Sequence, residues 1–524
     1  MAATVSAQVR VDGSRSLGPI RRVWASIGYD ELNWTYTPRG KALYRTLGDN
    51  VFTGGPYYVR MHNTFTSGTG LSRPAGGGGN PYHEMPDGTV RYYWEIIDRT
   101  FDTIVSNGGV PLVELGFMPR DLSRATVPEA VFGGSNDLGV EPYESGAWKA
   151  PPKDLGKWGD LVTAFVAHCV ERYGVAGVAT WRFELWNEPD IRNYWHGTFE
   201  EYAALYDATA AAVKRACPAA AVGGPATTDH GTDFLTRFLD HIEQTGAALD
   251  FLSFHTKGAY FAPRRVYNPF LDVPKGGPSA EKMLGDIHRN LAAIAAHPRF
   301  TDMPVYVDEC DPAVGTIYGV HDNPNFTVTN SEHYASIVCH LAAALLDLPP
   351  VERMTHWAFY MEGKRWFEGN RTLVDNENIE KPILNGLRLL ERLAGGERLL
   401  ATANAVGVGT LAVRLPGMVR ILLWHHDDVW WDDGRISVDL TITDAATHGG
   451  VILWRLDREH ANVHTAWRAC GAPDDPTPAQ VAAIRAAGAL RGEPLEATRR
   501  NGMVHIGLDL PRYGVALVEV ATAH

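Results

Sequence analysis

Long apolar runs are missing from this 524-residue sequence, in which no stretch approaches the roughly 18 consecutive apolar residues of a membrane-spanning helix. The segment Met1–Ser14 contains no basic stretch followed by an apolar run, so it does not resemble a secretory signal. Cysteine is scarce, with five scattered residues and no CxxC pair, which favours free thiols over a disulfide framework. These absences predict a cytoplasmic protein that has no membrane partner.

Long runs of like charge are also missing. The net charge of −13 is spread along the chain, which makes nucleic acid an unfavourable partner. Neither a GxGxxG after a first strand nor a GxxxxGKS/T motif is present to hold phosphate groups. HExxH and clustered Cys/His spacings are absent too, so no metal and no cofactor is expected. The segment His425–Asp428 is interpreted as a solvated strand end and not as a metal site.

The length and composition suit a globular protein of two to three domains. Aromatic residues are abundant, with 15 Trp and 20 Tyr. Most of them are expected in cores and interfaces. Their flat faces are also suited to stacking on the apolar faces of a ligand such as a sugar.

Short apolar runs alternate with longer helical patterns from Arg22 to Leu390. Apolar residues at three- and four-residue spacing predict a helix over Leu155–Tyr173. The apolar segment Val178–Asn187 that follows is typical of a buried strand. A capping box at Thr198–Glu201 then predicts the start of a second helix.

Eight buried strands are predicted in this region. They are Val23–Gly28, Tyr57–His62, Val110–Leu115, the strand ending at Asn187, Ala220–Gly224, Phe251–His255, Val305–Glu309 and Thr355–Tyr360. Eight such runs joined by helices predict an α/β fold, a (β/α)8 TIM barrel with long loops over residues 15–395. Continuous apolar runs are typical of parallel strands buried on both faces. The alternative is a doubly wound open sheet.

The pattern changes after about Gly395. Short β-rich runs separated by turn signals occur at Gly407–Leu415, Met418–His425, Ile436–Ile442, Gly450–Arg455, Val504–Leu508 and Gly514–Val520. They predict an accessory antiparallel β-sandwich. The β-like segment Ser6–Asp12 is expected to add a strand, so the sandwich is assigned to residues 1–14 and 396–524. A helical insertion is predicted at Pro478–Ala487.

Two glutamates lie at the ends of predicted barrel strands, where the catalytic residues of such barrels gather. Glu188 follows the fourth strand and Glu309 ends the seventh. Glycoside cleavage needs a protonated carboxyl group for the leaving oxygen and an ionised carboxylate across the sugar. Direct attack by the carboxylate requires a separation of roughly 5–5.5 Å, whereas a wider gap admits water and gives inversion. The sequence leaves this distance open.

Four segments carry a resemblance to a known family. Trp186–Pro189 (WNEP) resembles the acid/base motif of the large (β/α)8 clan of retaining glycosidases. Within that clan, Tyr58–Asn63 (YVRMHN), Ser253–Thr256 (SFHT) and Arg455–Asn462 (RLDREHAN) resemble glycoside hydrolase family 39. This family holds β-xylosidases and α-L-iduronidases, and the resemblance covers both the barrel and the sandwich.

The resemblance implies roles for polar residues at the strand ends. Glu188 would be the acid/base and Glu309 the nucleophile, which Arg60 would hold ionised. The substrate-binding residues that it implies are His62, Asn187, His255, Trp357 and Glu362. The loop with Glu362 departs from the family, whose xylosidases have adjacent acidic residues there. Simple core packing or ion pairing is the alternative for each supporting residue.

The combined expectation is a cytoplasmic retaining exo-β-xylosidase that acts on short xylo-oligosaccharides through a covalent glycosyl-enzyme intermediate. An α-L-iduronidase is the alternative within the family, because cations near the rim suit a uronate carboxylate. These cations are Lys257, Arg264, Lys364 and Arg365. A catalytically silent carbohydrate-binding protein on the same barrel is the alternative from another class. A homo-oligomer is possible, but nothing in the sequence decides it.

Overall fold

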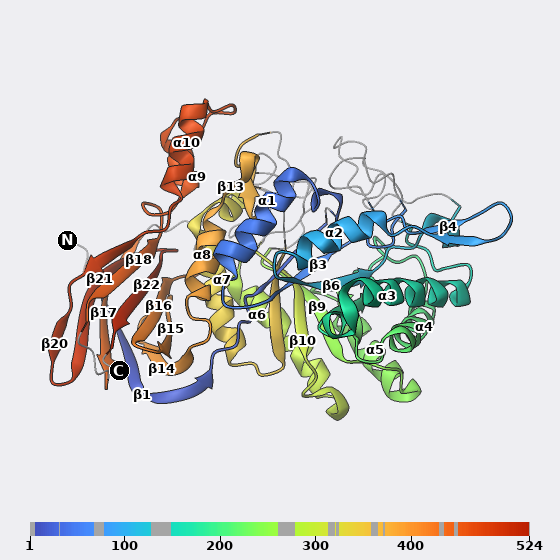
Figure 1. The fold of residues 1–524 in the computed structure, drawn as a ribbon. Helices are drawn as coiled ribbons and strands as arrows, with labels where there is room; N and C mark the ends of the chain where they lie inside the picture. Colours follow the sequence, from blue (N-terminus) through green and yellow to red (C-terminus); the bar gives the residue numbers. More distant parts are fainter. Residues whose placement is uncertain are drawn as a thin grey trace, which may run out of the picture.

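The computed structural model describes residues 6–30, 32–67, 78–126, 148–259, 278–312, 320, 324–357, 365–369, 372–428, 434–444 and 449–522. These residues form a closed (β/α)8 barrel and a separate accessory β-sheet. The sheet lies beside the barrel, and the first and the last described strands both belong to it (Figure 1). The predicted fold class is therefore confirmed.

Eight parallel strands close the barrel. They are β2 (Ser26–Tyr29), β3 (Tyr57–Met61), β6 (Gly109–Leu115), β7 (Arg182–Leu185), β8 (Ala221–Thr227), β9 (Phe251–Lys257), β10 (Val305–Asp311) and β11 (Val351–Trp357). Each strand pairs with the next, and β11 pairs with β2, so the sheet has no edge and is not doubly wound. The predicted fourth strand began too early, because Val178 ends the preceding helix.

Helices cover the outside of the barrel (Figure 1). They are α1 (Pro38–Thr46), α2 (Glu95–Val105), α3 (Leu155–Val178), α4 (Phe199–Ala216), α5 (Thr232–Thr245), α6 (Ala280–Ala295), α7 (Glu332–Leu346) and α8 (Pro382–Glu391). Short strands form the pairs β4 (Tyr82–Glu84) with β5 (Val90–Tyr92) and β12 (Val374–Asp375) with β13 (Ile379–Glu380). Short helical turns occur at Leu32–Trp34, Leu47–Val51, Arg120–Leu122, Pro298–Phe300, Pro324–Asn330 and Asn376–Asn378.

The helices begin and end where local chemistry directs them. The Asp154 side chain caps α3 by accepting the Lys157 N–H, and Gly174 interrupts this helix with a φ of 76°. The predicted capping box of α4 is confirmed, because Thr198 and Glu201 each accept the other's backbone N–H. Such caps satisfy donors that would otherwise lack partners at the first turn.

The accessory sheet contains ten strands. They are β1 (Ser6–Pro19), β14 (Glu397–Ala403), β15 (Val408–Leu415), β16 (Met418–His425), β17 (Arg435–Thr443), β18 (Val451–Leu456), β19 (Gly492–Leu495), β20 (Thr498–Arg500), β21 (Met503–Pro511) and β22 (Val515–Ala521). Their order is β19-β18-β22-β16-β15-β14-β1-β17-β21-β20. Pairing is antiparallel except between β1 and β17, which run parallel. The sheet is thus largely antiparallel.

Both halves of this sheet share one apolar core. Val9 of β1, Ile421 of β16, Leu440 of β17 and Ile506 of β21 belong to the same cluster of buried side chains. Strands distant in the order therefore face each other across a common interior, as in a sandwich. The continuous sheet curls to enclose its own core.

A helical insertion projects from the sheet (Figure 1). It consists of α9 (Val463–Ala469) and α10 (Pro478–Ala487), and the second helix has the predicted bounds. Apolar side chains of both helices pack on Trp366 and Phe367, which follow the last barrel strand. The insertion therefore joins the accessory sheet to a loop at the carboxyl end of the barrel.

The interface between sheet and barrel buries the segment that was expected to be a solvated strand end. His425 and His426 are only 6% and 3% exposed, so that expectation is wrong. His426 Nδ1 lies 2.9 Å from Ser336 Oγ of α7. Asp428 accepts hydrogen bonds from Ser279 Oγ and the Ala280 N–H at the start of α6. The barrel helices α6 and α7 cover this segment. The sequence of the strand alone therefore does not predict that the segment is buried.

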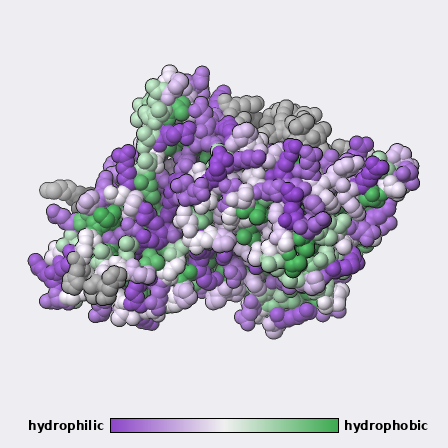
Figure 2. Space-filling model, viewed as in Figure 1, coloured by the Kyte–Doolittle hydropathy of each residue, from purple (hydrophilic) through white to green (hydrophobic). Residues whose placement is uncertain are grey.

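The surface shown in Figure 2 is mostly hydrophilic, with hydrophobic residues scattered in small groups. No helix among the described residues has both the length and the apolar character needed to cross a membrane. All five cysteines are unpaired, and four of them are buried.

Candidate active site

The carboxyl ends of the barrel strands bring the candidate catalytic residues together. Trp186 and Glu188, which follow β7, have φ values of 67° and 45°. Such left-handed conformations are uncommon for residues other than glycine and occur often at functional sites. The Glu188 N–H donates to the Ala226 carbonyl on the next strand, at 2.9 Å. This tight turn fixes the position from which the Glu188 side chain projects.

Glu309, at the carboxyl end of β10, is surrounded by cationic side chains. Arg60 Nη1 lies 3.0 Å from Glu309 Oε1, and His62 Nε2 lies 3.1 Å from the same oxygen. Lys257 Nζ donates to Glu309 Oε2 at 2.6 Å and to Asp311 Oδ2 at 2.8 Å. Charge-assisted hydrogen bonds of this kind hold a carboxylate ionised and fix its orientation.

His255 lies between the two glutamates. Its Nδ1 is 2.8 Å from Glu188 Oε1 and 3.6 Å from Glu309 Oε2. Oxygens of the two carboxyl groups lie within 4.8 Å of one another. The Glu188 side chain is 13% exposed, whereas that of Glu309 is 4% exposed. One carboxyl group therefore reaches solvent while the other is held inside.

The surroundings separate the pKa values of the two glutamates. Burial raises the pKa of Glu188 well above its usual range, and the negative charge of Glu309 raises it further. Burial alone would also raise the pKa of Glu309, but the cations Lys257 and His62 beside it hold it well below its usual range. The arrangement thus supplies one protonated and one ionised carboxyl group, which are the two forms needed for glycoside cleavage.

The histidines differ in charge. Burial would lower the pKa of His62, but Glu114, Asp30 and Glu309 raise it to about 10, so its ring is cationic. Burial lowers the pKa of His255 well below its ordinary value, so its ring is neutral. Lys257 and His62, together with Arg60, are therefore the cations that balance the negative charge of Glu309.

Residues 7–505 match the family model described as Glycosyl hydrolases family 39. The chain belongs to this family. The β-xylosidase of Geobacillus stearothermophilus is 27% identical, over 88% of this chain and 86% of the relative. The α-L-iduronidase of Homo sapiens is 26% identical, over 91% of this chain and 73% of the relative. The family 39 chain is therefore a glycoside hydrolase.

The fold of the family 39 chain is shared with a solved structure, that of a monomeric β-xylosidase from Caulobacter crescentus CB15. The two chains superpose with a TM-score of 0.77 at 24% identity, over 99% of this chain and 100% of the other. At this identity the likeness concerns the fold.

The other expected residues of this family 39 site are also found near the glutamates. Asn187 Oδ1 accepts from Arg60 Nη2 at 3.1 Å. The Trp357 ring lies 4.7 Å from the ring of His62, centroid to centroid, and the Arg60 guanidinium lies 5.1 Å from the same indole. Both ring nitrogens of His62 contact protein carboxylates, Asp30 and Glu309. Glu362 lies outside the described residues, as do Arg264 and Lys364.

A layer of buried carboxyl groups beneath the family 39 site was not predicted. Arg60 Nε lies 2.6 Å from Glu184 Oε2 and 3.0 Å from Asp308 Oδ2. Burial and the neighbouring Glu184 raise the pKa of Asp308 well above its usual range. Burial likewise raises the pKa of Glu114 to about 7. The sequence feature that could have predicted this layer is a charged residue within an otherwise apolar barrel strand, on the face directed to the barrel interior.

Glu188, His255 and Glu309 have a donor composition that a metal ion could use. However, Arg60 and Lys257 already balance the charge of Glu309 at hydrogen-bond distance. An additional cation would be repelled at these distances. The trio in this family 39 site therefore suits proton transfer and nucleophilic attack better than metal binding.

Proposed function

We propose that the chain is a retaining exo-β-xylosidase that removes terminal xylose from short xylo-oligosaccharides. The observation that carries the retaining mechanism is the separation of at most 4.8 Å between carboxyl oxygens of Glu188 and Glu309. This spacing suits direct attack by a carboxylate better than the roughly 6.5–9.5 Å gap of inverting enzymes. The β-xylosidase name of the relative from Geobacillus stearothermophilus supports the choice of substrate.

In the first step, Glu309 attacks the anomeric carbon while the bond from that carbon to the leaving oxygen breaks. Glu188 gives its proton to the leaving oxygen, and a covalent glycosyl ester forms on Glu309. In the second step, Glu188 takes a proton from water, which attacks the anomeric carbon and releases Glu309. Two displacements at one carbon restore the original anomeric configuration.

The neighbouring residues support this chemistry. Arg60 and Lys257 keep Glu309 ionised and oriented through the contacts described above. Asn187 is anchored by Arg60 in a position to bind the sugar 2-hydroxyl, a contact that strengthens in the transition state. Trp357 is fully buried and packs on His62 and Arg60, so it holds these two side chains in place from within the barrel.

The first experiment is hydrolysis of 4-nitrophenyl β-D-xylopyranoside, with NMR observation of the first-formed anomer. The β-anomer is expected, because retention follows from the covalent intermediate. The α-anomer would refute the retaining mechanism. Glu309→Ala is the matched variant, and turnover near that of the unaltered enzyme would refute the assignment of the nucleophile. Binding of xylo-oligosaccharide without turnover by the unaltered chain would instead identify a catalytically silent binding protein.

A second candidate, an α-L-iduronidase, is favoured by the position of Lys257. β-D-Xylopyranosides and α-L-iduronides share the configuration of C1 to C4 and differ in the substituent at C5. Lys257 is 8% exposed, and its ammonium group contacts both Glu309 and Asp311 at the end of β10. An ammonium at this place is suited to receive a carboxylate at C5. The iduronidase name of the human relative agrees with this alternative.

Parallel assays with the xyloside and with 4-nitrophenyl α-L-iduronide separate the two candidates. A uronidase is expected to prefer the iduronide, and Lys257→Met is expected to reverse this preference by removing the partner of the uronate. A xylosidase is expected to prefer the xyloside before and after the substitution. The xyloside proposal fails if the iduronide is cleaved and the xyloside is not.

We also propose that the enzyme works in the cytoplasm, which its five unpaired cysteines support. Fractionation of the source cells, followed by activity measurement, tests this location. Activity found mainly outside the cytoplasmic fraction would contradict it.

A further inference from the structure

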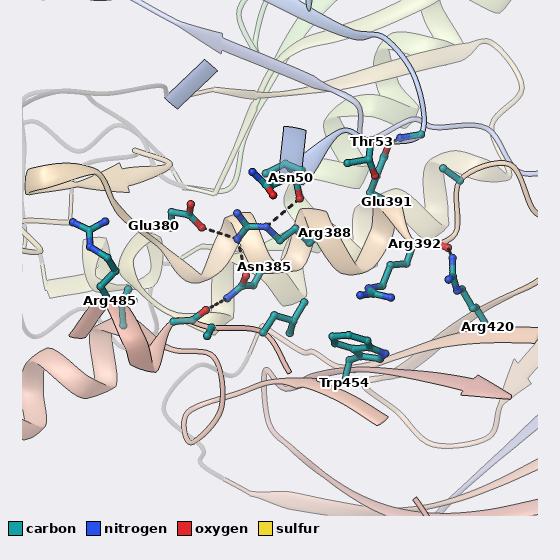
Figure 3. A pocket seen from close by; sticks show the side chains of 17 residues that line it. Asn50, Thr53, Glu380, Asn385, Arg388, Glu391, Arg392, Arg420, Trp454 and Arg485 are labelled. Carbon is teal, nitrogen blue, oxygen red and sulfur yellow. Dashed lines mark hydrogen bonds and ion pairs between the residues drawn. The ribbon is translucent and has the colours of Figure 1, made fainter. Parts of the chain in front are cut away.

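A cleft of about 920 Å³ lies between the barrel and the accessory sheet, away from Glu188 and Glu309. Helix α8 forms one side, β16 and β18 of the sheet contribute Arg420 and Trp454, and the end of α10 contributes Arg485. The labelled side chains surround a common space in Figure 3. Three parts of the fold therefore build one cavity whose lining is rich in arginine.

The arginines are positioned by contacts with the protein. Arg388 donates to Asn385 Oδ1 at 2.8 Å and lies 2.7 Å from Glu380 Oε2, as the dashed lines in Figure 3 mark. Arg485 donates to the backbone carbonyls of Glu377 and Asn378. These anchors hold the guanidinium groups in place before any ligand arrives, which lowers the entropy cost of binding.

Arg392 and Arg420 share a single carboxylate. Arg392 Nη1 lies 3.0 Å from Glu519 Oε1, and Arg420 Nε lies 2.8 Å from the same oxygen. The Arg392 guanidinium also stacks on Trp454, 3.7 Å from the ring centroid. Among the described residues, neither Nη2 atom of this pair has a protein acceptor. Glu519 is thus one carboxylate shared by two cations, Arg392 and Arg420, which are held in place. Guanidinium N–H donors and excess positive charge are therefore directed into the cleft.

The two acids of the lining, Glu380 and Glu391, are outnumbered by its four arginines, and Glu380 is paired with Arg388. Glu391 accepts from Arg22, from Trp24 Nε1 at 2.9 Å and from the Gly54 N–H at 2.7 Å. The carboxylate of Glu391 is thus occupied on the barrel side. A net positive cavity stands out in a chain whose net charge is −13.

We propose that this cleft binds a small ligand carrying an oxyanion, such as the carboxylate of an acidic sugar or a phosphate group. Planar guanidinium groups present paired donors that match the geometry of these oxyanions. The side chains of Arg388, Arg392 and Arg420 are 18%, 30% and 22% exposed, so a ligand from solvent can reach them. This proposal is independent of the glycosidase reaction, because it uses none of the residues around Glu309.

Isothermal titration calorimetry with inorganic phosphate, D-glucuronate and D-xylose tests the proposal. Phosphate or glucuronate is expected to bind at millimolar concentration, and binding of glucuronate alone would identify the acidic sugar as the source of the oxyanion. Neutral xylose is the control for binding in the active site, and the cleft variants described next distinguish binding of glucuronate in the cleft from its binding in that site. Absence of binding by both anions would overturn the proposal.

Arg392→Gln is expected to weaken the binding of phosphate or glucuronate about tenfold or more, because a hydrogen bond from a charged group is lost. Arg420→Gln is the second variant if the first fails to fold, as judged by circular dichroism. Arg500→Gln, which changes an exposed arginine of β20, is the matched control and should leave binding within about twofold, since it lies outside the cleft. Equal binding by the control and by both cleft variants would also overturn the proposal.

Discussion

Glu114 provides the sharpest test of the electrostatics beneath the active site. It is fully buried on β6, and neither carboxylate oxygen accepts a hydrogen bond from the described residues. His62 Nε2 lies 3.4 Å from Glu114 Oε2. Burial raises the pKa of Glu114 from 4.5 to about 7, although His62 and Arg60 oppose the rise. The folded protein therefore binds a proton here that the unfolded chain releases between these two pH values.

The sign of the effect on stability follows from linkage. A carboxyl group with a raised pKa contributes stability that is complete below pH 4.5 and is lost as the pH rises through 7. The amide in Glu114→Gln cannot ionise, so this variant does not lose stability as the pH rises through 7. The variant is expected to gain about 1 kcal/mol relative to the unaltered protein at pH 5 and about 3 kcal/mol at pH 8. Any packing cost of the amide is the same at both pH values and cancels in the difference, which is about 2.5 kcal/mol.

Urea denaturation at pH 5 and pH 8 measures this difference. Infrared spectroscopy gives an independent reading, because the part of the protonated carboxyl absorption that disappears near pH 7 in the unaltered protein should be missing in Glu114→Gln. The reasoning is refuted if the two proteins lose stability in parallel between the two pH values. It is equally refuted if the infrared titration near pH 7 is unchanged by the substitution.

Three further predictions concern the catalytic pair and the interface between the domains. Glu188→Gln should slow cleavage of unactivated xylo-oligosaccharides by about 100- to 10,000-fold but spare aryl glycosides with good leaving groups, because only the former need the acid. Equal losses of activity on both substrates in steady-state kinetics would contradict this role. Lys257→Met should raise the pKa of Glu309 and move the acid limb of the kcat/KM profile to higher pH, while the surface variant Lys153→Met leaves the limb in place. Burial and His426 lower the pKa of His333, so this residue costs stability as the pH falls below 6.5. His333→Phe keeps the stacking on Tyr513 and should reduce the drop in Tm between pH 7 and pH 5, and an unchanged drop would count against the mechanism.

The barrel could be predicted because its strands are continuous apolar runs separated by amphipathic helices. Glu188 and Glu309 could be singled out because each interrupts the end of such a run, where the strands of a barrel converge. The distance between them could not be obtained in this way. It depends on the left-handed turn at Trp186 and Glu188 and on the contacts of His255, which only the folded chain assembles.

Other features were missed because their cause lies far away in the sequence. Lys257 was considered as a rim cation, yet it contacts the carboxylate of Glu309 directly. Glu184 and Asp308 are charged residues in otherwise apolar strands, but only the folded chain places Arg60 beside both of them. The burial of His426 likewise requires α7, which no local pattern brings to the sheet. Long-range packing decides each of these cases.

The placement of β1 has a mechanical consequence. This strand lies between β14 and β17, so Val9 pairs with both Ala403 and Leu440. The whole barrel is thus enclosed in a loop whose two ends are fastened together by the sheet. A force that pulls the two ends of the chain apart passes through the hydrogen bonds of the sheet and bypasses the barrel. A protease that unfolds the chain from one end would have to detach β1 or its partner strands from the sheet before the pulling force acted on the active site.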